Sequence, residues 1–183
     1  MVSPWVYQHK TWRDKLHDLA IRFSAISASL TLCRGSHDAS NQIPGVFQIE
    51  ADLGQWRSSW LKEAHTGVAI KCVCYLSTPL SCICSVPAQE FPTIEFGLLQ
   101  IECWSLQLII STTLTDLAVN RPEWMTRDIS DLPLRSSQIA SQIEAANNFY
   151  AASRPTDQSS GITEDVCRMI FPLWALKEYR DKS

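Results

Sequence analysis

Glycine is scarce in this sequence, with six in 183 residues, and neither a Gly-x-Gly-x-x-Gly fingerprint nor a Walker phosphate-binding loop is present. The zinc-protease pattern His-Glu-x-x-His and the nucleophile elbow Gly-x-Ser-x-Gly are also missing. Residues 1–10 contain no uninterrupted apolar run, so we expect no secretory signal. These absences predict a chain with no catalytic residue, no cofactor and no metal site, and therefore a protein that is not an enzyme.

Positive charge is missing from the middle of the chain. Residues 72–120 contain no Lys or Arg against four acidic residues, while residues 1–34 carry five basic and two acidic residues. The formal net charge of the whole chain is −3. Because a nucleic-acid-binding face needs clustered basic side chains, we predict no direct, specific binding of DNA by this chain.

The most apolar stretch runs over residues 96–119. It is interrupted by two amides and two carboxylates, namely Gln100, Glu102, Gln107 and Asp116. A lipid-facing span rarely carries so many polar groups. The composition therefore predicts a buried helix and no membrane partner.

Hydrophobic periodicity predicts an all-α fold, an irregular bundle of about five helices. In the first helix, apolar residues recur at steps of three and four from Trp12 to Leu30, which is the period of one helical face. Residues 37–45 are expected to be a polar loop. The expected helices cover residues 11–33, 46–64, 93–119, 135–152 and 163–179.

Residues 66–92 do not fit this pattern, because three prolines divide them into short pieces. We expect an irregular insertion containing Pro and Cys, within a single helical domain or domain fragment that spans residues 1–183. Thr93 can cap the helix that follows, and Pro172 must bend or restart the last one.

Seven cysteines, an odd number, with no secretory signal favour reduced thiols in an intracellular protein. Cys72-Val-Cys74 and Cys82-Ile-Cys84 could supply four thiolates to zinc, but structural zinc sites favour a gap of two residues rather than one. We interpret these cysteines as small buried hydrophobes. The same interpretation covers the remaining cysteines, Cys33, Cys103 and Cys167.

Three other patterns suggest chemistry but have a simpler explanation. Ser36-His37-Asp38 contains the residue types of a hydrolase triad, yet adjacent side chains point apart, which favours a polar loop. Glu95 and Glu102 share a helical face and are expected to form a solvated stripe. Seven tryptophans could line a ligand groove, but core packing is the default expectation for those on helix faces: Trp12, Trp56, Trp60 and Trp104.

Several stretches, taken in order, resemble the C-terminal regulatory region of fungal zinc-cluster transcription factors. The first, residues 50–60, places an acidic, Leu-containing run before Trp56 and Trp60. The second, residues 96–110, is a long apolar helix with a central Trp104. The third, residues 139–150 followed by Phe171-Pro-Leu-Trp-Ala-Leu176, resembles the family's closing pair of helices. The resemblance extends over residues 46–180.

The resemblance implies a regulatory domain that acts through protein contacts in the nucleus, with a zinc-cluster transcription factor as a possible partner. It also implies a setting in fungal gene regulation, including that of secondary metabolism. The family's DNA-binding module needs Cys-x-x-Cys pairs, and this sequence contains none, so no DNA contact can be assigned here. The alternative is a small helical accessory protein or enzyme of a biosynthetic pathway with a Trp-lined pocket.

Overall fold

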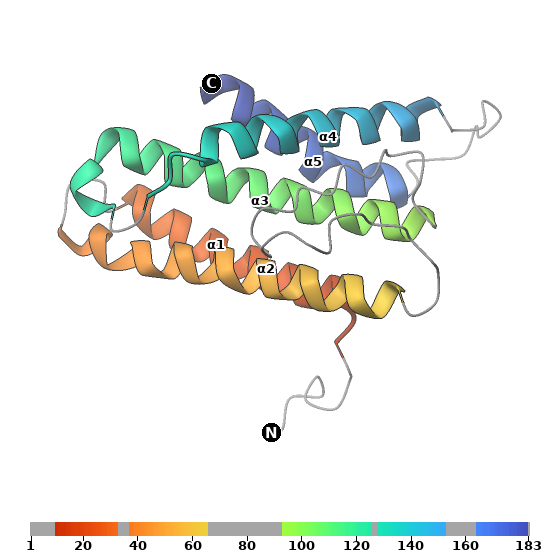
Figure 1. Ribbon diagram of the computed structural model, residues 1–183, viewed down its shortest axis with the longest axis horizontal. Coiled ribbons are helices and arrows are strands. Elements are labelled where there is room, and N and C mark those ends of the chain that lie inside the picture. Colours follow the sequence, from red (N-terminus) through yellow and green to blue (C-terminus); the bar gives the residue numbers. More distant parts are fainter. Residues whose placement is uncertain (1–9, 33–36, 66–92, 126–127, 153–163, 183) are drawn as a thin grey trace. The chain divides into compact units, whose positions relative to one another are not determined.

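The computed structural model describes residues 10–32, 37–65, 93–125, 128–152 and 164–182 (Figure 1). Within these residues every regular element is a helix, which confirms the predicted all-α class with about five helices. The α-helices are α1 (Trp12–Leu32), α2 (Ile43–His65), α3 (Ile94–Asn120), α4 (Leu132–Ala152) and α5 (Glu164–Lys182). Two short 3-10 helices accompany them, η2 (His37–Gln42) and η5 (Pro122–Trp124).

The chain divides into two compact units, Met1–Glu63 and Ala64–Ser183. Nearly all of α1 and α2 belongs to the first unit, while α3, α4 and α5 belong to the second. The expected single domain over residues 1–183 stays a prediction. The expected irregular insertion, residues 66–92, lies outside the described residues.

Helix α1 begins with a reciprocal hydrogen-bonded cap. The Asp14 backbone N–H donates to Thr11 Oγ1 over 3.1 Å, and the Thr11 N–H donates back to Asp14 Oδ2 over 2.9 Å. The Thr11 hydroxyl also donates to Asp14 Oδ2 over 2.7 Å, and this bond, followed by the one from the Thr11 N–H, lowers the pKa of the Asp14 carboxyl below its usual value. The apolar face predicted for this helix is confirmed, since its central residues are buried: Leu16, Leu19, Phe23 and Leu30.

Helix α2 begins earlier than the sequence suggested. The prediction of a polar loop over residues 37–45 is wrong. The 3-10 helix η2 occupies residues 37–42 and leads directly into α2 at Ile43. Pro44 does not prevent this, since the first turn of a helix needs no backbone N–H donor. Ile43 is only 2% exposed and anchors the start of the helix. At Gly45, an added Cβ would lie 2.8 Å from Ile26 Cδ1, so glycine leaves room for the Ile26 side chain.

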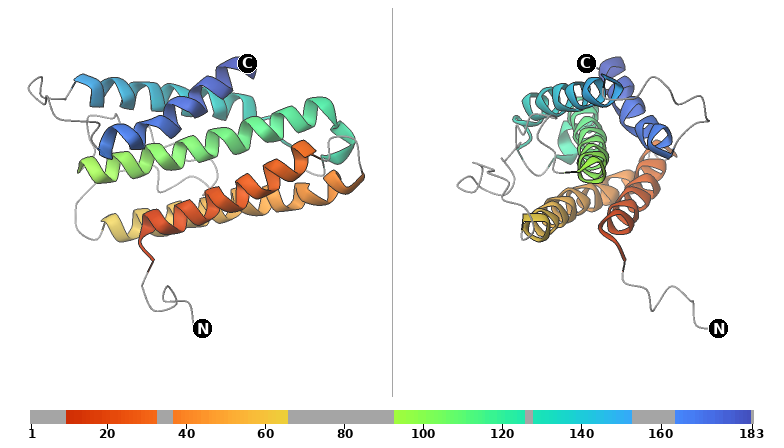
Figure 2. Two further views of the ribbon diagram at one scale, coloured as in Figure 1. Left: turned by 180° about the vertical axis from the view of Figure 1, so that it is seen from behind. Right: turned by 90° about the vertical axis from the view of Figure 1, so that its right-hand side faces the viewer.

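Helices α1 and α2 run side by side in opposite directions (Figures 1 and 2) and are joined by tryptophans. The Trp56 indole N–H donates to the Trp12 carbonyl over 2.9 Å, and the two rings meet edge to face with centroids 6.1 Å apart. Trp56 also stacks on Trp60 at 5.3 Å. Aromatic pairs of this kind stabilise packing beyond the area they bury, so these rings help to hold the two helices together.

A polar contact joins the same two helices at the surface. Arg22 Nη1 lies 2.8 Å from Asp52 Oδ2, and Gln48 Nε2 donates to Asp52 Oδ1 over 2.8 Å. Asp52 therefore accepts one hydrogen bond from its own helix and one from α1. The bond from Gln48 and then that from Arg22 lower the pKa of the Asp52 carboxyl.

Helix α3 is buried around most of its circumference, and its polar residues are buried with it. Ser105 is fully buried and its hydroxyl donates to the Ile101 carbonyl over 2.7 Å; Thr112 does the same to Leu108 over 2.8 Å. A hydroxyl that bonds to its own helix can enter an apolar environment without an unmade hydrogen bond. The predicted N-cap is confirmed, because the Phe96 N–H donates to Thr93 Oγ1 over 3.1 Å.

Helices α4 and α5 both pack against α3, as the end-on view in Figure 2 shows. The residues that fill the space between the three helices form one apolar cluster. Its buried members are Ile101, Trp104 and Leu108 of α3, Ile139, Ala140, Ile143 and Ala146 of α4, and Ala175 and Leu176 of α5. The second unit is thus built on α3.

Replacing Leu108 by alanine removes a side chain that has no exposed surface and lies in the middle of this cluster. We expect a loss of about 2–5 kcal/mol in unfolding free energy, measured by urea denaturation, because the deletion leaves a cavity between the helices. Leu134→Ala on α4, where the side chain is 66% exposed, is the matched control and should change stability by less than about 0.5 kcal/mol. Equal losses in the two variants would contradict the position of the core.

The Asp52 contact predicts a pH dependence of stability. Because the folded-state pKa of Asp52 is below its unfolded value of 3.8, the ionised carboxylate stabilises the fold above that pH. The contribution falls as the pH drops through the lowered folded-state pKa. The wild-type chain should therefore exceed Asp52→Asn in stability at pH 6, and the difference should shrink toward pH 2. Thermal unfolding at several pH values measures it, and a constant difference would refute the contact.

Candidate protein-contact surface

Helix α5 is apolar on two opposite faces over a short stretch. One face is buried inside the second unit, and its buried residues are Pro172, Ala175 and Leu176. The other face is open, with Ile170 61%, Leu173 55% and Trp174 46% exposed. These three side chains follow the i, i+3, i+4 spacing of one helical surface and are called the α5 ridge below. Exposed apolar side chains gathered on one surface are typical of a protein-contact site.

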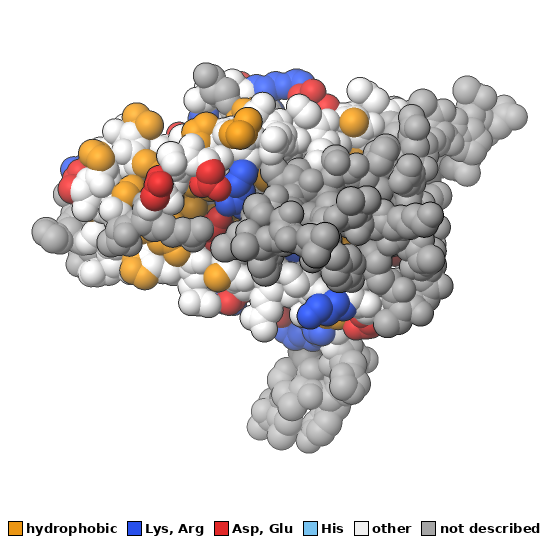
Figure 3. Space-filling model, viewed as in Figure 1, with side chains coloured by type: hydrophobic (Ala, Val, Ile, Leu, Met, Phe, Trp, Pro, Cys, Tyr) orange, Lys and Arg blue, Asp and Glu red, His pale blue; other side chains and the backbone are white. Residues whose placement is uncertain are grey.

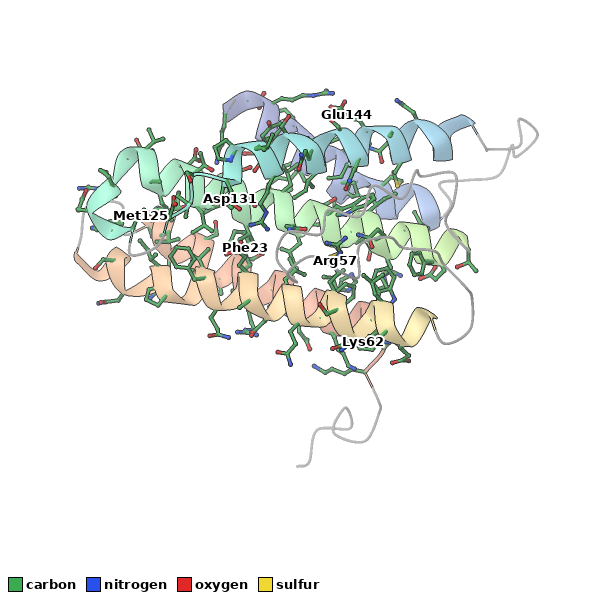
Figure 4. The ribbon with its side chains drawn as sticks, viewed as in Figure 1. Phe23, Arg57, Lys62, Met125, Asp131 and Glu144 are labelled. Atoms are coloured by element: carbon green, nitrogen blue, oxygen red, sulfur yellow. The ribbon has the colours of Figure 1, made fainter. Side chains whose placement is uncertain are left out.

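Two ion pairs fix the C-terminal turn of α5 to its neighbours. Lys182 Nζ lies 2.6 Å from Asp116 Oδ2 near the end of α3. Arg180 Nη2 lies 2.6 Å from Glu144 Oε1 on α4, and Glu144 is labelled in Figure 4. Surface pairs of this kind contribute little energy. The burial of Ala175 and Leu176 in the cluster decides which face of α5 is turned outward, and the pairs are consistent with it.

Pro172 does not restart the helix as one alternative predicted, because α5 is continuous from Glu164 to Lys182. Its ring is almost completely buried, so the residue without a backbone N–H lies on the covered side of the helix. On either side of it, the Phe171 and Trp174 rings stack with centroids 6.0 Å apart. This contact restricts the orientation of the Trp174 ring.

The charges beside the α5 ridge neutralise one another. Lys177, on the next turn of the same face, lies 2.6 Å from Asp181 Oδ2, and this hydrogen bond raises the pKa of the lysine. Figure 3 shows the face on which α4 lies in front of α5, and there too acidic and basic side chains lie next to each other. The ridge therefore offers an apolar contact with an aromatic anchor, and its neighbourhood does not favour a charged polymer such as DNA.

Most of the sequence patterns that suggested chemistry lie outside the described residues. This holds for both Cys-x-Cys pairs, and for the side chains of Ser36-His37-Asp38. Cys103 of α3 has no exposed surface, as expected for a thiol that packs as a small hydrophobe. Within the described part of the chain, no group of three or more His, Cys, Asp or Glu residues could hold a metal ion.

We expected Glu95 and Glu102 to form a solvated stripe on α3, and this expectation is wrong for Glu102. Glu95 is exposed in the first turn, but Glu102 is only 7% exposed. The two glutamates share a helical face, yet that face enters the interior between the first turn and the third. Sequence spacing alone could not show this, because it places residues on a face without saying how far along the helix that face remains in water.

Three of the four tryptophans expected in the core are buried, and the fourth, Trp12, is half-buried. Trp56 and Trp60 stack on each other with 6% and 4% exposure, and Trp104 is 2% exposed in the cluster of the second unit. The default expectation for these three residues is confirmed. Trp174 differs from these three residues because 46% of its surface is exposed. In the sequence it stands out only as part of the segment Phe171–Leu176 that carries the resemblance.

The α5 ridge was missed at the sequence level, although a signal for it exists. Residues 169–176 are eight consecutive apolar residues, which place hydrophobic side chains on every side of two helical turns. A helix with one covered face needs apolar residues on that face alone. The additional apolar residues on the other sides of the helix indicate a second contact surface.

Comparison of the chain with protein-family models, with curated proteins and with solved structures gives no match. In the described residues, no helix combines the length and apolar content required to cross a membrane.

Proposed function

We propose that this chain is a helical regulatory domain that acts in transcription through protein contacts, in the nucleus, with a zinc-cluster transcription factor as its partner. The proposal assigns the chain no catalytic role. The segments that carry the family resemblance support it, because they all lie on helices and follow one another on α2, α3, α4 and α5. A setting in fungal secondary-metabolite regulation is part of the same proposal.

The observation that carries this proposal is the α5 ridge. Two of its three residues, Leu173 and Trp174, lie within the Phe-Pro-Leu-Trp segment that contributes to the resemblance, and both are on the open side of α5. Helices bind grooves on other proteins through anchors at i, i+3 and i+4, and tryptophan is enriched among the residues that dominate such interfaces. A partner that fits must supply an apolar groove with space for an indole ring.

The alternative function, a small accessory protein or enzyme with a Trp-lined pocket, has less support. The buried tryptophans Trp56, Trp60 and Trp104 use their ring faces for packing against other residues of their own units. An acid–base site would need titratable groups with strongly shifted pKa values around a shared cavity. In the described part of the chain, the pKa values of Asp14, Asp52, Asp128 and Lys177 are shifted by local hydrogen bonds, and these four groups lie in separate contacts.

A tethering experiment tests the proposal. The full chain is fused to an unrelated DNA-binding module whose sites control a reporter gene in a fungal host. We expect the fusion to change reporter output, and we expect Leu173→Asp to abolish the change, because loss of one central anchor costs about 2 kcal/mol of binding or more.

The matched control is Leu134→Asp, since Leu134 is exposed to a similar degree on α4 of the same unit. This variant should retain the full effect, and circular dichroism of both purified variants should match the wild-type chain. A fusion that leaves the reporter unchanged, or an equal loss in the two variants, would contradict a contact through α5.

The charge distribution makes a separate prediction about DNA. Helix α3, the longest, has no Lys or Arg, and the net charge of the chain is −3. Tight DNA binders commonly neutralise about six or more phosphates. In a mobility-shift titration at ~150 mM salt, the isolated chain should show weak, salt-sensitive association at most. Sequence-specific binding at nanomolar concentration would refute the proposal that DNA is reached only through a partner.

A further inference from the structure

We draw no further inference here: the strongest candidate, the apolar ridge of Ile170, Leu173 and Trp174 on α5, belongs to the contact surface already described, and nothing in the structure shows what covers it.

Discussion

Burial of α3 on most of its sides is the constraint on which the second unit depends. A helix of 27 residues can be covered this way only if its polar groups need no water. Ser105, Thr112 and Thr115 meet that condition by donating to carbonyls four residues earlier in the same helix. Their hydroxyls therefore require no partner on a neighbouring helix. The residues that α4 and α5 contribute to the cluster around α3 are apolar, and the buried polar residues of α4 are Arg135 and Ser136.

The arrangement of α5 follows from this packing. Its Ala175 and Leu176 fill the cluster beside Trp104 and Leu108, and its last turn is tied to α3 and α4 by ion pairs. Once that face is used, the eight apolar residues 169–176 leave side chains for which the described helices provide no cover. The α5 ridge is thus a consequence of a helix that is more apolar than its place in the unit requires. The protein contact that we propose for this chain accounts for that excess.

Periodicity and capping rules predicted the helices well, because both act over a few neighbouring residues. The Thr93 cap and the buried face of α1 are local features of this kind. The start of α2 was misjudged because Pro44 and Gly45 resemble a turn, although a first helical turn tolerates both. Burial was harder to predict for polar residues. Whether Glu102 meets water depends on which other segments cover α3, and that information is spread over the whole chain.

The site was less predictable than the fold for the same reason. An exposed Leu173 and a buried Leu176 are equivalent in sequence, and only the packing of α5 against α3 and α4 distinguishes them. The ion pairs Lys182–Asp116 and Arg180–Glu144 join residues far apart in the chain, so no local sequence pattern predicts them. The excess of apolar residues in 169–176 could have indicated a second surface, but not which side chains would form it.

Native-state amide hydrogen exchange of the full chain tests most directly whether α3 is the core of the second unit. If it is, the amides of residues 98–114 should be the slowest to exchange in that unit and should open only when the unit unfolds as a whole. The amide of Leu134, in the first turn of α4 and on a residue that is 66% exposed, should exchange faster by local fraying. Exchange of residues 98–114 as fast as that amide would contradict the account.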